Sequence, residues 1–189
     1  MKPIDEKLCA APVEIVARAL VGKLIQRQEV LLRITEVEAY AGPEDSASHA
    51  RFGLTKRNAV MFGPPGYAYV YLCYGVHNML NVVAEPEPRA AAVLIRAAEL
   101  ISGRETVQKR RGQPPGPKWL AGPGKVAQAL ALGREHTGLC LLGQSELTLL
   151  DDGAAPRITT SARIGIDFAR PKDRRRRWRF ADADSPSRK

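Results

Sequence analysis

The chain has 189 residues, a length that favours a single domain with its own buried core. Its 29 Lys and Arg against 20 Asp and Glu give a net charge of +9, which favours nucleic acid and, after it, an anionic membrane surface as partner. We expect no signal peptide and no membrane span, and three scattered cysteines without a zinc spacing favour a reduced, cytoplasmic protein.

The N-terminal part of the chain predicts one helix followed by strands. Apolar residues at helical spacing indicate a helix over 12–21, which Gly22 ends. A strand pair is predicted at 23–27 and 29–40 around a polar turn. The long polar loop at 42–65 is of a length that is often functional in a compact domain.

The alternation of side chains along the strand at 29–40 raises a question about charge. Strict alternation places on one face Leu32, Ile34, Glu36, Glu38 and Tyr40. Two carboxylates then continue a face that begins apolar, which is a costly position for charge. The pattern therefore predicts that this strand ends at a functional site.

The middle of the chain predicts a hairpin rich in tyrosine. A strand over 67–74 turns at Gly75–Val76 and returns through 79–84. After a turn at 85–88, a further strand is expected at 90–97. This arrangement brings the middle of the chain into an antiparallel sheet.

The C-terminal part has weaker signals. Helices are predicted at 98–111 and 125–132, with a loop at 113–117 between them. Short strands are expected at 139–142, 147–150 and 157–166, and the chain is basic from Arg170 onward. We expect residues 182–189 to form a frayed tail.

Glu38 and Arg96 are open to two interpretations. A carboxylate on a mostly apolar strand can serve as a general base for a bound water, or it can be half of a structural ion pair with Arg96 or Arg33. Arg96 shares a face with Ala92 and Leu94, and an inward-facing arginine is nearly always paired. A Glu38–Arg96 contact would fit both interpretations.

The tyrosines divide into two groups. Tyr67, Tyr69 and Tyr71 share one strand face, where core packing is the simplest explanation of Tyr69. Tyr74 stands beside glycine at the hairpin tip and is expected to be exposed, where it could wedge between bases. Tyr40, His49 and Tyr71 could form the walls of a pocket for a flipped base, although a loop histidine alone is a weak signal.

Other motifs are less specific. Residues 122–127 fit a loose GxGxxA pattern, but the strand that should precede it is poor and a P-loop is excluded. The segment could meet a phosphate through Lys125 or be no more than a turn and cap. The arginine run at 174–177 is either a solvated tail or a phosphate contact. The residues imply no metal site.

Together these motifs resemble the alkyladenine (3-methyladenine) DNA glycosylase family, also called methylpurine-DNA glycosylase, of the type without a helix-hairpin-helix. Each motif alone is weak, but their order over nearly the whole chain is specific. The motifs are Val21–Lys23, Glu36–Tyr40, Pro43–Asp45, Ser48–Ala50, Arg57–Asn58, Met61–Phe62, Tyr69–Tyr71, Tyr74–Gly75, Leu80–Asn81, Val93–Ala97, Gly122–Lys125, Arg163–Gly165 and Trp178–Phe180.

The resemblance implies roles for individual residues. Glu38 would deprotonate a water that Arg96 helps to hold. The flipped base would stack against Tyr40, His49 and Tyr71, and Asn81 would screen against guanine. Contacts to DNA fall to Tyr74, which would fill the gap in the duplex, and to Val76, His77, Arg57 and Lys125.

The resemblance also implies a fold and a reaction. The fold would be α+β, a single mixed domain over 1–181 with a curved antiparallel β-sheet flanked by short helices. The reaction would be monofunctional hydrolysis of a damaged purine (3-methyladenine, 7-methylguanine, hypoxanthine or ethenoadenine) from double-stranded DNA, leaving an abasic site without lyase activity. The reaction would need no metal and no cofactor. We expect a bacterial monomer that needs no membrane and no obligate protein partner.

This chain departs from the family pattern at two places. Many members carry Met and then an aromatic residue after the motif at Tyr74–Gly75, whereas this chain has Val76-His-Asn-Met79. The C-terminal part is also unusually rich in arginine.

Two alternatives remain at the level of sequence. The first is a catalytically silent protein that binds damaged DNA through Tyr74 and the basic face, for which an intact Glu38 and Arg96 would be unnecessary. The second is a general RNA-binding protein, which the lack of an aromatic single-strand signature disfavours.

Overall fold

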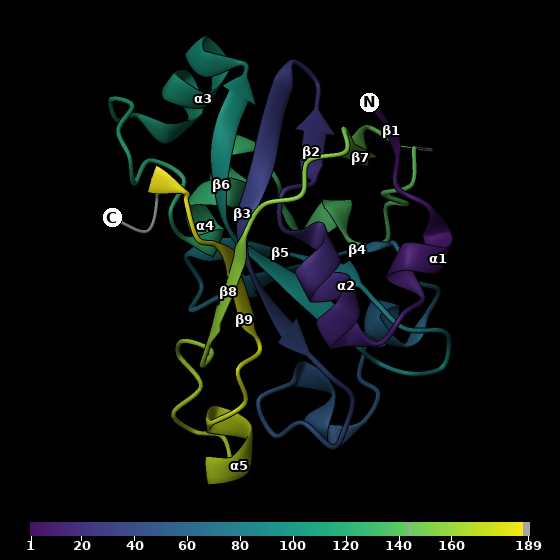
Figure 1. The fold of residues 1–189 in the computed structure, drawn as a ribbon. Coiled ribbons are helices and arrows are strands. Elements are labelled where there is room, and N and C mark those ends of the chain that lie inside the picture. Colours follow the sequence, from purple (N-terminus) through teal and green to yellow (C-terminus); the bar gives the residue numbers. More distant parts are fainter. Residues whose placement is uncertain (144, 187–189) are drawn as a thin grey trace.

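Two long strands, β3 (Val30–Tyr40) and β6 (Ala92–Ser102), run side by side through the centre of the molecule (Figure 1). The computed structural model describes residues 1–143 and 145–186, and in these residues nine strands form one antiparallel sheet. The order along the main path is β1 (Lys2–Pro3), β7 (Leu147–Asp151), β2 (Leu24–Arg27), β3, β6, β5 (His77–Val83) and β4 (Ala68–Cys73).

The sheet curls because β3 has two partners in succession on one edge. Its first residues pair with β2, and its residues Glu36–Glu38 pair with β9 (Arg179–Asp182), which in turn pairs with β8 (Ile158–Ser161). The opposite edge of β3 pairs with β6 along its length. The α+β class and the curved antiparallel sheet expected from the sequence are thereby confirmed.

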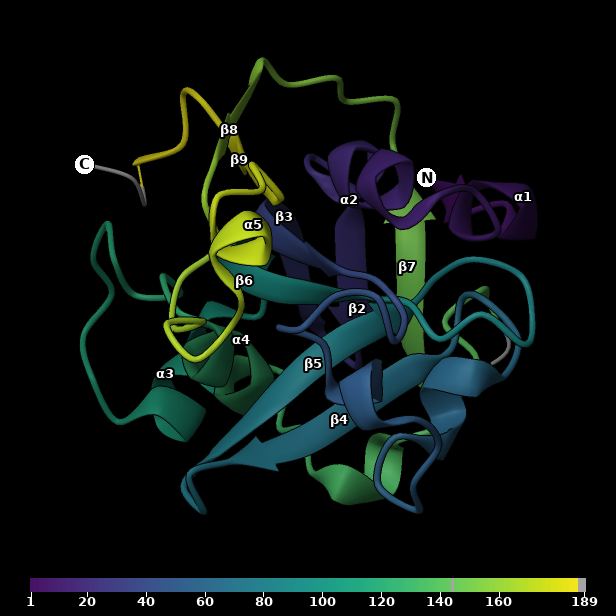
Figure 2. The same cartoon turned by 90° about the horizontal axis from the view of Figure 1, so that it is seen from below.

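Short helices cover the sheet, and their apolar faces form the main core with it. Leu20 of one helix and Leu130 beside another are both fully buried in this core, together with Ile34 and Ile95 of the central strands. The helices are α1 (Glu6–Cys9), α2 (Val13–Leu20), α3 (Arg104–Arg111), α4 (Pro123–Ala129) and α5 (Pro171–Arg174), with 3-10 turns η1 (His49–Phe52), η2 (Ala59–Phe62) and η3 (Arg134–His136). Figure 2 shows α2 above the sheet and the β4–β5 hairpin reaching out beside α3 and α4.

A β-bulge in β3 changes which residues face the core. The register with β6 shifts on both sides of Glu36, so alternation is interrupted there. Ile34 before the bulge and Val37 and Ala39 after it all lie in the main core. The predicted face that joined Leu32 and Ile34 to Glu36 and Glu38 is therefore wrong: the carboxylates point to the opposite side of the sheet from the apolar residues.

Some element boundaries differ from the predictions for local reasons. The expected helix at 98–111 is a strand up to Ser102, and α3 begins only at Arg104. Gly103 makes the change of direction at φ 84°, where a Cβ would lie 2.8 Å from the carbonyl oxygen of Glu29. The strand expected at 139–142 is only a single bridge from Cys140 to Tyr67, and the one expected at 157–166 is limited to β8.

The C-terminal segment is built into the fold as far as it is described. Four residues form β9, and Ser185 is buried with its Oγ donating a hydrogen bond to Glu99 Oε1 at 2.6 Å. Residues 187–189 of the expected frayed tail lie outside the described residues. Each helix of the described part is too short or too polar to cross a bilayer.

Candidate active site and nucleic-acid interface

Four neighbouring strands place four side chains in one row across the sheet. Glu38 on β3 lies opposite Leu94 on β6, Leu94 opposite Asn81 on β5, and Asn81 opposite Tyr69 on β4. Side chains that are directly opposite in an antiparallel pair project from the same face about 5 Å apart. The sheet therefore carries a carboxylate, an amide and a phenol on the face turned away from the main core.

A cavity of about 400 Å³ opens on this face. Among the described residues its lining includes two arginines and no acidic side chain. Aromatic walls with a few polar groups are typical of a pocket for a planar ligand. The lining is Tyr40, Ala47, His49, Arg51, Arg57, Met61, Tyr69, Tyr71, Leu72, Cys73, Tyr74, Asn81, Ala92, Gly165, Ile166 and Phe168.

Glu38 lies behind this lining and has no exposed surface. Its Oε2 accepts hydrogen bonds from the Tyr40 hydroxyl at 2.8 Å and from Arg96 Nη1 at 3.1 Å. Its Oε1 accepts the backbone N–H of Ile164 at 2.8 Å. Both oxygens thus have donors, as a carboxylate buried in a protein requires.

Opposing effects act on the pKa of Glu38. Burial raises it above the ordinary value of 4.5, while Arg96, the Ile164 N–H and the Tyr40 hydroxyl act to lower it. Arg96 also donates from Nε to Glu36 Oε1 at 3.0 Å, so one guanidinium serves two carboxylates. The predicted contact between Glu38 and Arg96 is present, and it leaves both the structural and the chemical interpretation open.

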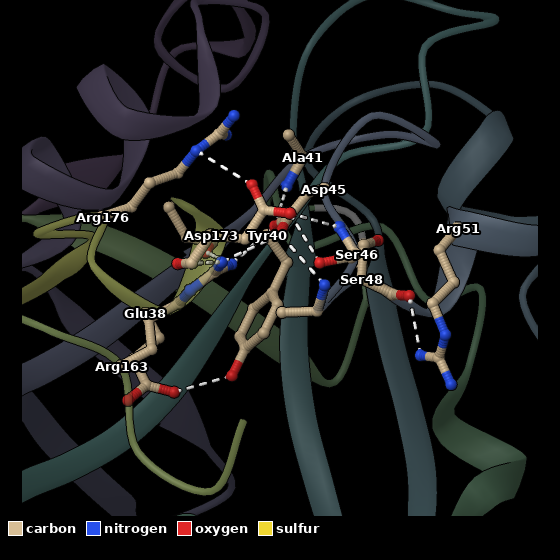
Figure 3. Close-up of polar contacts among 12 residues, drawn as sticks. Glu38, Tyr40, Ala41, Asp45, Ser46, Ser48, Arg51, Arg163, Asp173 and Arg176 are labelled. Carbon is tan, nitrogen blue, oxygen red and sulfur yellow. Dashed lines mark hydrogen bonds and ion pairs between the residues drawn. The ribbon is translucent and has the colours of Figure 1, made fainter. Parts of the chain in front are cut away.

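Tyr40 separates Glu38 from the cavity. Its ring is part of the cavity lining. Its hydroxyl is hydrogen-bonded to Glu38, as Figure 3 shows. The guanidinium of Arg163 lies 4.7 Å from the centroid of the Tyr40 ring. Burial and the charge of Glu38 raise the pKa of the Tyr40 phenol well above 10, so the hydroxyl remains a donor.

His49 and the tyrosines of β4 form a contiguous aromatic wall. The rings of His49 and Tyr71 are 4.5 Å apart edge to face, and His49 Nδ1 is hydrogen-bonded to the Tyr69 hydroxyl at 2.9 Å. Burial, with Arg57 and Arg51 nearby, lowers the pKa of His49 to about 4. The imidazole is therefore neutral at physiological pH.

Asn81 is held rigidly at one side of the cavity. It is buried, and its Nδ2 donates to the carbonyl oxygens of Tyr69 at 3.0 Å and Met79 at 3.3 Å. Both amide protons of Asn81 are thus donated to backbone carbonyls, and these two hydrogen bonds fix the direction of its acceptor atom, Oδ1.

The hairpin that joins β4 to β5 presents Tyr74 at its tip. Tyr74 is 93% exposed and has φ 49°, a left-handed conformation that is unusual for a tyrosine. Val76 is 71% exposed beside it. The expected exposure of Tyr74 at a turn beside Gly75 is confirmed, and the turn spans Tyr74 to Val76.

The remaining residues predicted to contact DNA lie around this hairpin. Arg57 lines the cavity with its guanidinium 5.2 Å from the Tyr71 ring centroid. His77 is exposed and packs against Gly124, where an added Cβ would lie 3.0 Å from the His77 ring. Lys125 is therefore near the hairpin, but it lies outside the cavity and its Nζ donates to the carbonyl of Lys118.

A buried network that sequence reasoning missed holds the loop after β3 against the C-terminal segment (Figure 3). Arg163 and Asp45 are completely buried and share two hydrogen bonds of 2.5 and 2.8 Å. Asp173 accepts from the backbone and hydroxyl of Ser46 and pairs with Arg176 at 3.3 Å. Asp45 and Arg163 belong to the family motifs Pro43–Asp45 and Arg163–Gly165. Membership in those motifs was the only signal in the sequence that could have pointed to the pair.

The described residues contain no group of three His, Cys, Asp or Glu that is placed to hold a metal ion. The charged groups of the site are instead arranged as pairs of carboxylate and guanidinium.

Comparison with known proteins gives a consistent family. A family model described as methylpurine-DNA glycosylase (MPG) matches residues 7–186. A protein of Arabidopsis thaliana named "DNA-3-methyladenine glycosylase" is 52% identical over 172 residues, covering 90% of this chain and 67% of that protein.

Two further relatives bear the name "Putative 3-methyladenine DNA glycosylase". The one from Nitrosococcus oceani is 44% identical, with 90% of this chain and 85% of that protein covered. The one from Methanocella arvoryzae is 46% identical, with 90% and 88% covered. Because a plant protein is among these relatives, the bacterial origin expected from the sequence stays a prediction.

Proposed function

This chain belongs to the methylpurine-DNA glycosylase family, whose members are DNA glycosylases, and we propose that it excises 3-methyladenine and 7-methylguanine from duplex DNA. Hypoxanthine and ethenoadenine are further candidate substrates. The observation that carries the proposal is the position of Glu38, a buried carboxylate directly behind an aromatic cavity whose lining, among the described residues, has no acidic side chain. Binding would turn the damaged nucleotide out of the duplex into this cavity.

In the proposed reaction, water attacks C1′ of the flipped nucleotide as the N-glycosidic bond breaks. Glu38 accepts the proton of the water, and the bonding electrons leave with the purine. The sugar becomes oxocarbenium-like, and a carboxylate nearby stabilises that charge. Water attacks rather than an amine, so the product is an abasic site and no lyase step follows.

Arg96 and Tyr40 would control when Glu38 meets water. Both occupy Oε2 of Glu38 in the free protein, and Glu38 has no exposed surface there. The Tyr40 ring is part of the cavity wall that the base would contact. We therefore propose that Tyr40 moves when the nucleotide enters, and that this movement lets water reach Glu38. Arg96 keeps Glu38 ionised against its desolvation and would help to hold the water.

Selectivity would come from the cavity walls. A purine alkylated at N3 or N7 is cationic, and its electron-poor ring stacks well on Tyr40 and Tyr71. A neutral His49 adds a third wall without repelling that cation. Asn81 would disfavour unmodified guanine through the exocyclic amino group of that base. 7-Methylguanine carries the same group, and its excision would rely on its cationic ring, which stacks well and is a good leaving group. Tyr74 would fill the gap left in the duplex.

A single-turnover excision assay tests the proposal. Duplex oligonucleotides carrying 7-methylguanine, hypoxanthine or ethenoadenine are incubated with wild type and with Glu38→Gln, and abasic sites are cleaved by heat or alkali. We expect base release by wild type and a loss of at least about 10²-fold in rate for the variant, the lower range for a general base. Equal rates for the two proteins would remove Glu38 from the reaction.

A second candidate function is a catalytically silent binder of damaged DNA. The complete burial of Glu38 favours it, because a saturated ion pair with Arg96 needs no chemistry to explain it. No base release by wild type, together with tight binding to the lesion duplex, would establish this function instead. We propose in either case that the protein acts as a monomer on double-stranded DNA without an obligate protein partner.

A further inference from the structure

Several large hydrophobic side chains in or near the cavity lining are exposed. Tyr74 and Phe168 both line the cavity and are 93% and 63% exposed. Phe52, at the end of η1, is 83% exposed. Exposed apolar surface beside a cavity marks a binding site more often than scattered apolar residues do.

Arg51 lies between these two phenylalanines. Its guanidinium is 4.6 Å from the centroid of the Phe52 ring and 5.0 Å from that of Phe168. Its Nη1 donates to the carbonyl oxygen of Ser48 at 3.1 Å, the contact drawn in Figure 3. In the described part of the chain no carboxylate pairs with it, so a cavity-lining cation has donors left over.

The segment that carries Arg51 and Phe52 is preorganised. Ser48 Oγ caps η1 by accepting the N–H of Ala50 at 3.1 Å. Asn58 Nδ2 donates to the carbonyl oxygens of His49 and Gly53, both at 3.0 Å. These bonds fix the backbone that carries the exposed Phe52 and the half-buried Arg51, which lowers the entropic cost of binding through them.

We propose that Phe52, Arg51 and Phe168 form a second DNA-contacting surface, here called the lesion-strand wall. Arg51 binds a phosphate next to the flipped nucleotide, and Phe168 packs against the neighbouring nucleotide of the same strand. This inference rests on the proposed function, because the flipped nucleotide defines which strand lies at the cavity mouth. Aromatic faces combined with unpaired arginine are the chemistry by which proteins hold a distorted nucleic-acid strand.

The choice of strand follows from the lining of the cavity. Arg51 and Phe168 both line the cavity that would receive the flipped nucleotide. The backbone on either side of that nucleotide belongs to the lesion strand and must pass the mouth of the cavity. The lesion strand is therefore the part of the DNA that these two side chains would meet.

Binding is measured on a duplex that carries an uncleavable abasic analogue, over a range of salt concentrations. Arg51→Gln is expected to reduce the slope of log affinity against log salt by about 1, the loss of one phosphate contact. Phe168→Ala is expected to weaken binding about tenfold with the slope unchanged, the effect of losing one stacking side chain. Ile101→Ala, which also truncates a half-exposed side chain but on the far end of β6, is the matched control and should match wild type.

Strand specificity is read with 2-aminopurine placed beside the lesion. The probe is on the lesion strand in one duplex and on the opposite strand in the other. Phe168→Ala should change the fluorescence of the bound complex only when the probe is on the lesion strand. A change confined to the opposite strand, or unchanged affinity and slope in both variants, would overturn the proposal.

The outcomes separate this inference from the proposed function. If wild type excises bases and the variants bind DNA like wild type, the proposal of the lesion-strand wall is wrong, whereas the proposed glycosylase function is supported. If wild type excises nothing and both variants still show the expected binding losses, the wall stands as part of a silent binder. Because Phe52, Arg51 and Phe168 are surface residues, equal thermal unfolding of all variants is expected and is checked first.

Discussion

At the scale of single residues, the site depends on a carboxylate that stays ionised although it is buried. Glu38 has no exposed surface, yet three donors from three different parts of the chain surround its two oxygens. Arg96 belongs to β6 and Ile164 to the segment after β8. The balance between burial and these donors sets the pKa of Glu38, and hence the pH at which a base is available.

The pH profile of excision follows from that balance. Glu38 must be ionised to accept a proton, and its pKa is raised above 4.5 by burial. Single-turnover rates on hypoxanthine duplex are therefore expected to rise with pH tenfold per unit below this pKa and to level off above it, with the bend above pH 4.5. A profile flat from pH 4.5 to 8 would contradict this assignment, and Glu38→Gln should show no such limb at all.

His49 predicts a pH dependence of stability. Its pKa is lowered from 6.5 in the unfolded chain to about 4 in the fold, mainly by burial. Between these values the unfolded state binds more protons, so the free energy of unfolding falls as pH drops from 6.5 towards 4. Urea unfolding at several pH values should show this decline, with a shallower slope in His49→Gln. The exposed His77→Gln should keep the wild-type slope.

How far single residues could be predicted depends on what their contacts require. Arg96 was foreseen, beside Arg33, as a partner of Glu38, because an inward-facing arginine is nearly always paired. The Ile164 N–H could not be foreseen, since a backbone donor leaves no trace in residue type. Lys125 was expected either to meet a phosphate or to belong to a mere turn and cap. Its ammonium group donates to the Lys118 carbonyl, and a contact with DNA stays a prediction.

At the scale of elements, the β4–β5 hairpin holds a conflict between stability and binding. Tyr74 adopts φ 49° at the tip while 93% of it is exposed, so the fold gains little from its ring and pays for its backbone conformation. Glycine would adopt that conformation without strain. A costly residue at an exposed position is expected where binding requires it.

Tyr74→Gly should therefore separate the two properties. We expect the free energy of unfolding to stay within about 1 kcal/mol of wild type, because relief of strain offsets the extra entropy of glycine in the unfolded chain. Affinity for a lesion duplex should fall about tenfold, the worth of one stacking side chain. Chemical denaturation and duplex titration measure the two. Loss of stability without loss of affinity would show that the ring serves the hairpin rather than DNA.

The strands themselves were largely predictable, and their faces were not. Periodicity located β3 and the hairpin within a residue or two at most ends. The bulge at Glu36 was not predicted, because an extra residue in one strand changes the pairing register without a signal in the amino-acid composition. Ala98 to Ser102 were assigned to a helix because alanine and leucine suit either element, and pairing with β3 decided for a strand.

At the scale of the whole molecule, the two halves of the chain are locked together behind the cavity. Figure 1 places α5 and the loop that follows β3 at the same end of the molecule. Asp45 of that loop and Arg163 of the C-terminal half pair with no exposure to water, and Asp173 extends the network through Ser46. This network also holds Arg163 over the Tyr40 ring.

Breaking this network should be costly. Asp45→Asn leaves the Arg163 guanidinium buried without its charge partner, and the expected loss is about 3–5 kcal/mol of unfolding free energy. Arg157→Gln breaks the exposed pair with Asp184 and should have no measurable effect. Urea unfolding compares the two, and similar small losses for both would show that the buried pair contributes nothing beyond a surface contact.

The contacts between the two halves of the chain have a consequence for folding during translation. Glu38 lies in the first quarter of the chain, but one of its hydrogen-bond donors is the backbone N–H of Ile164. The strand that pairs with β3 beside Glu38 is β9, which also lies near the C-terminus. A nascent chain that has released β3, β6 and the hairpin still lacks these parts. Base excision is therefore expected only of a chain that contains β9. A product that stops before Ile164 would lack its N–H to Glu38 and also the part of the cavity lining formed by Gly165, Ile166 and Phe168.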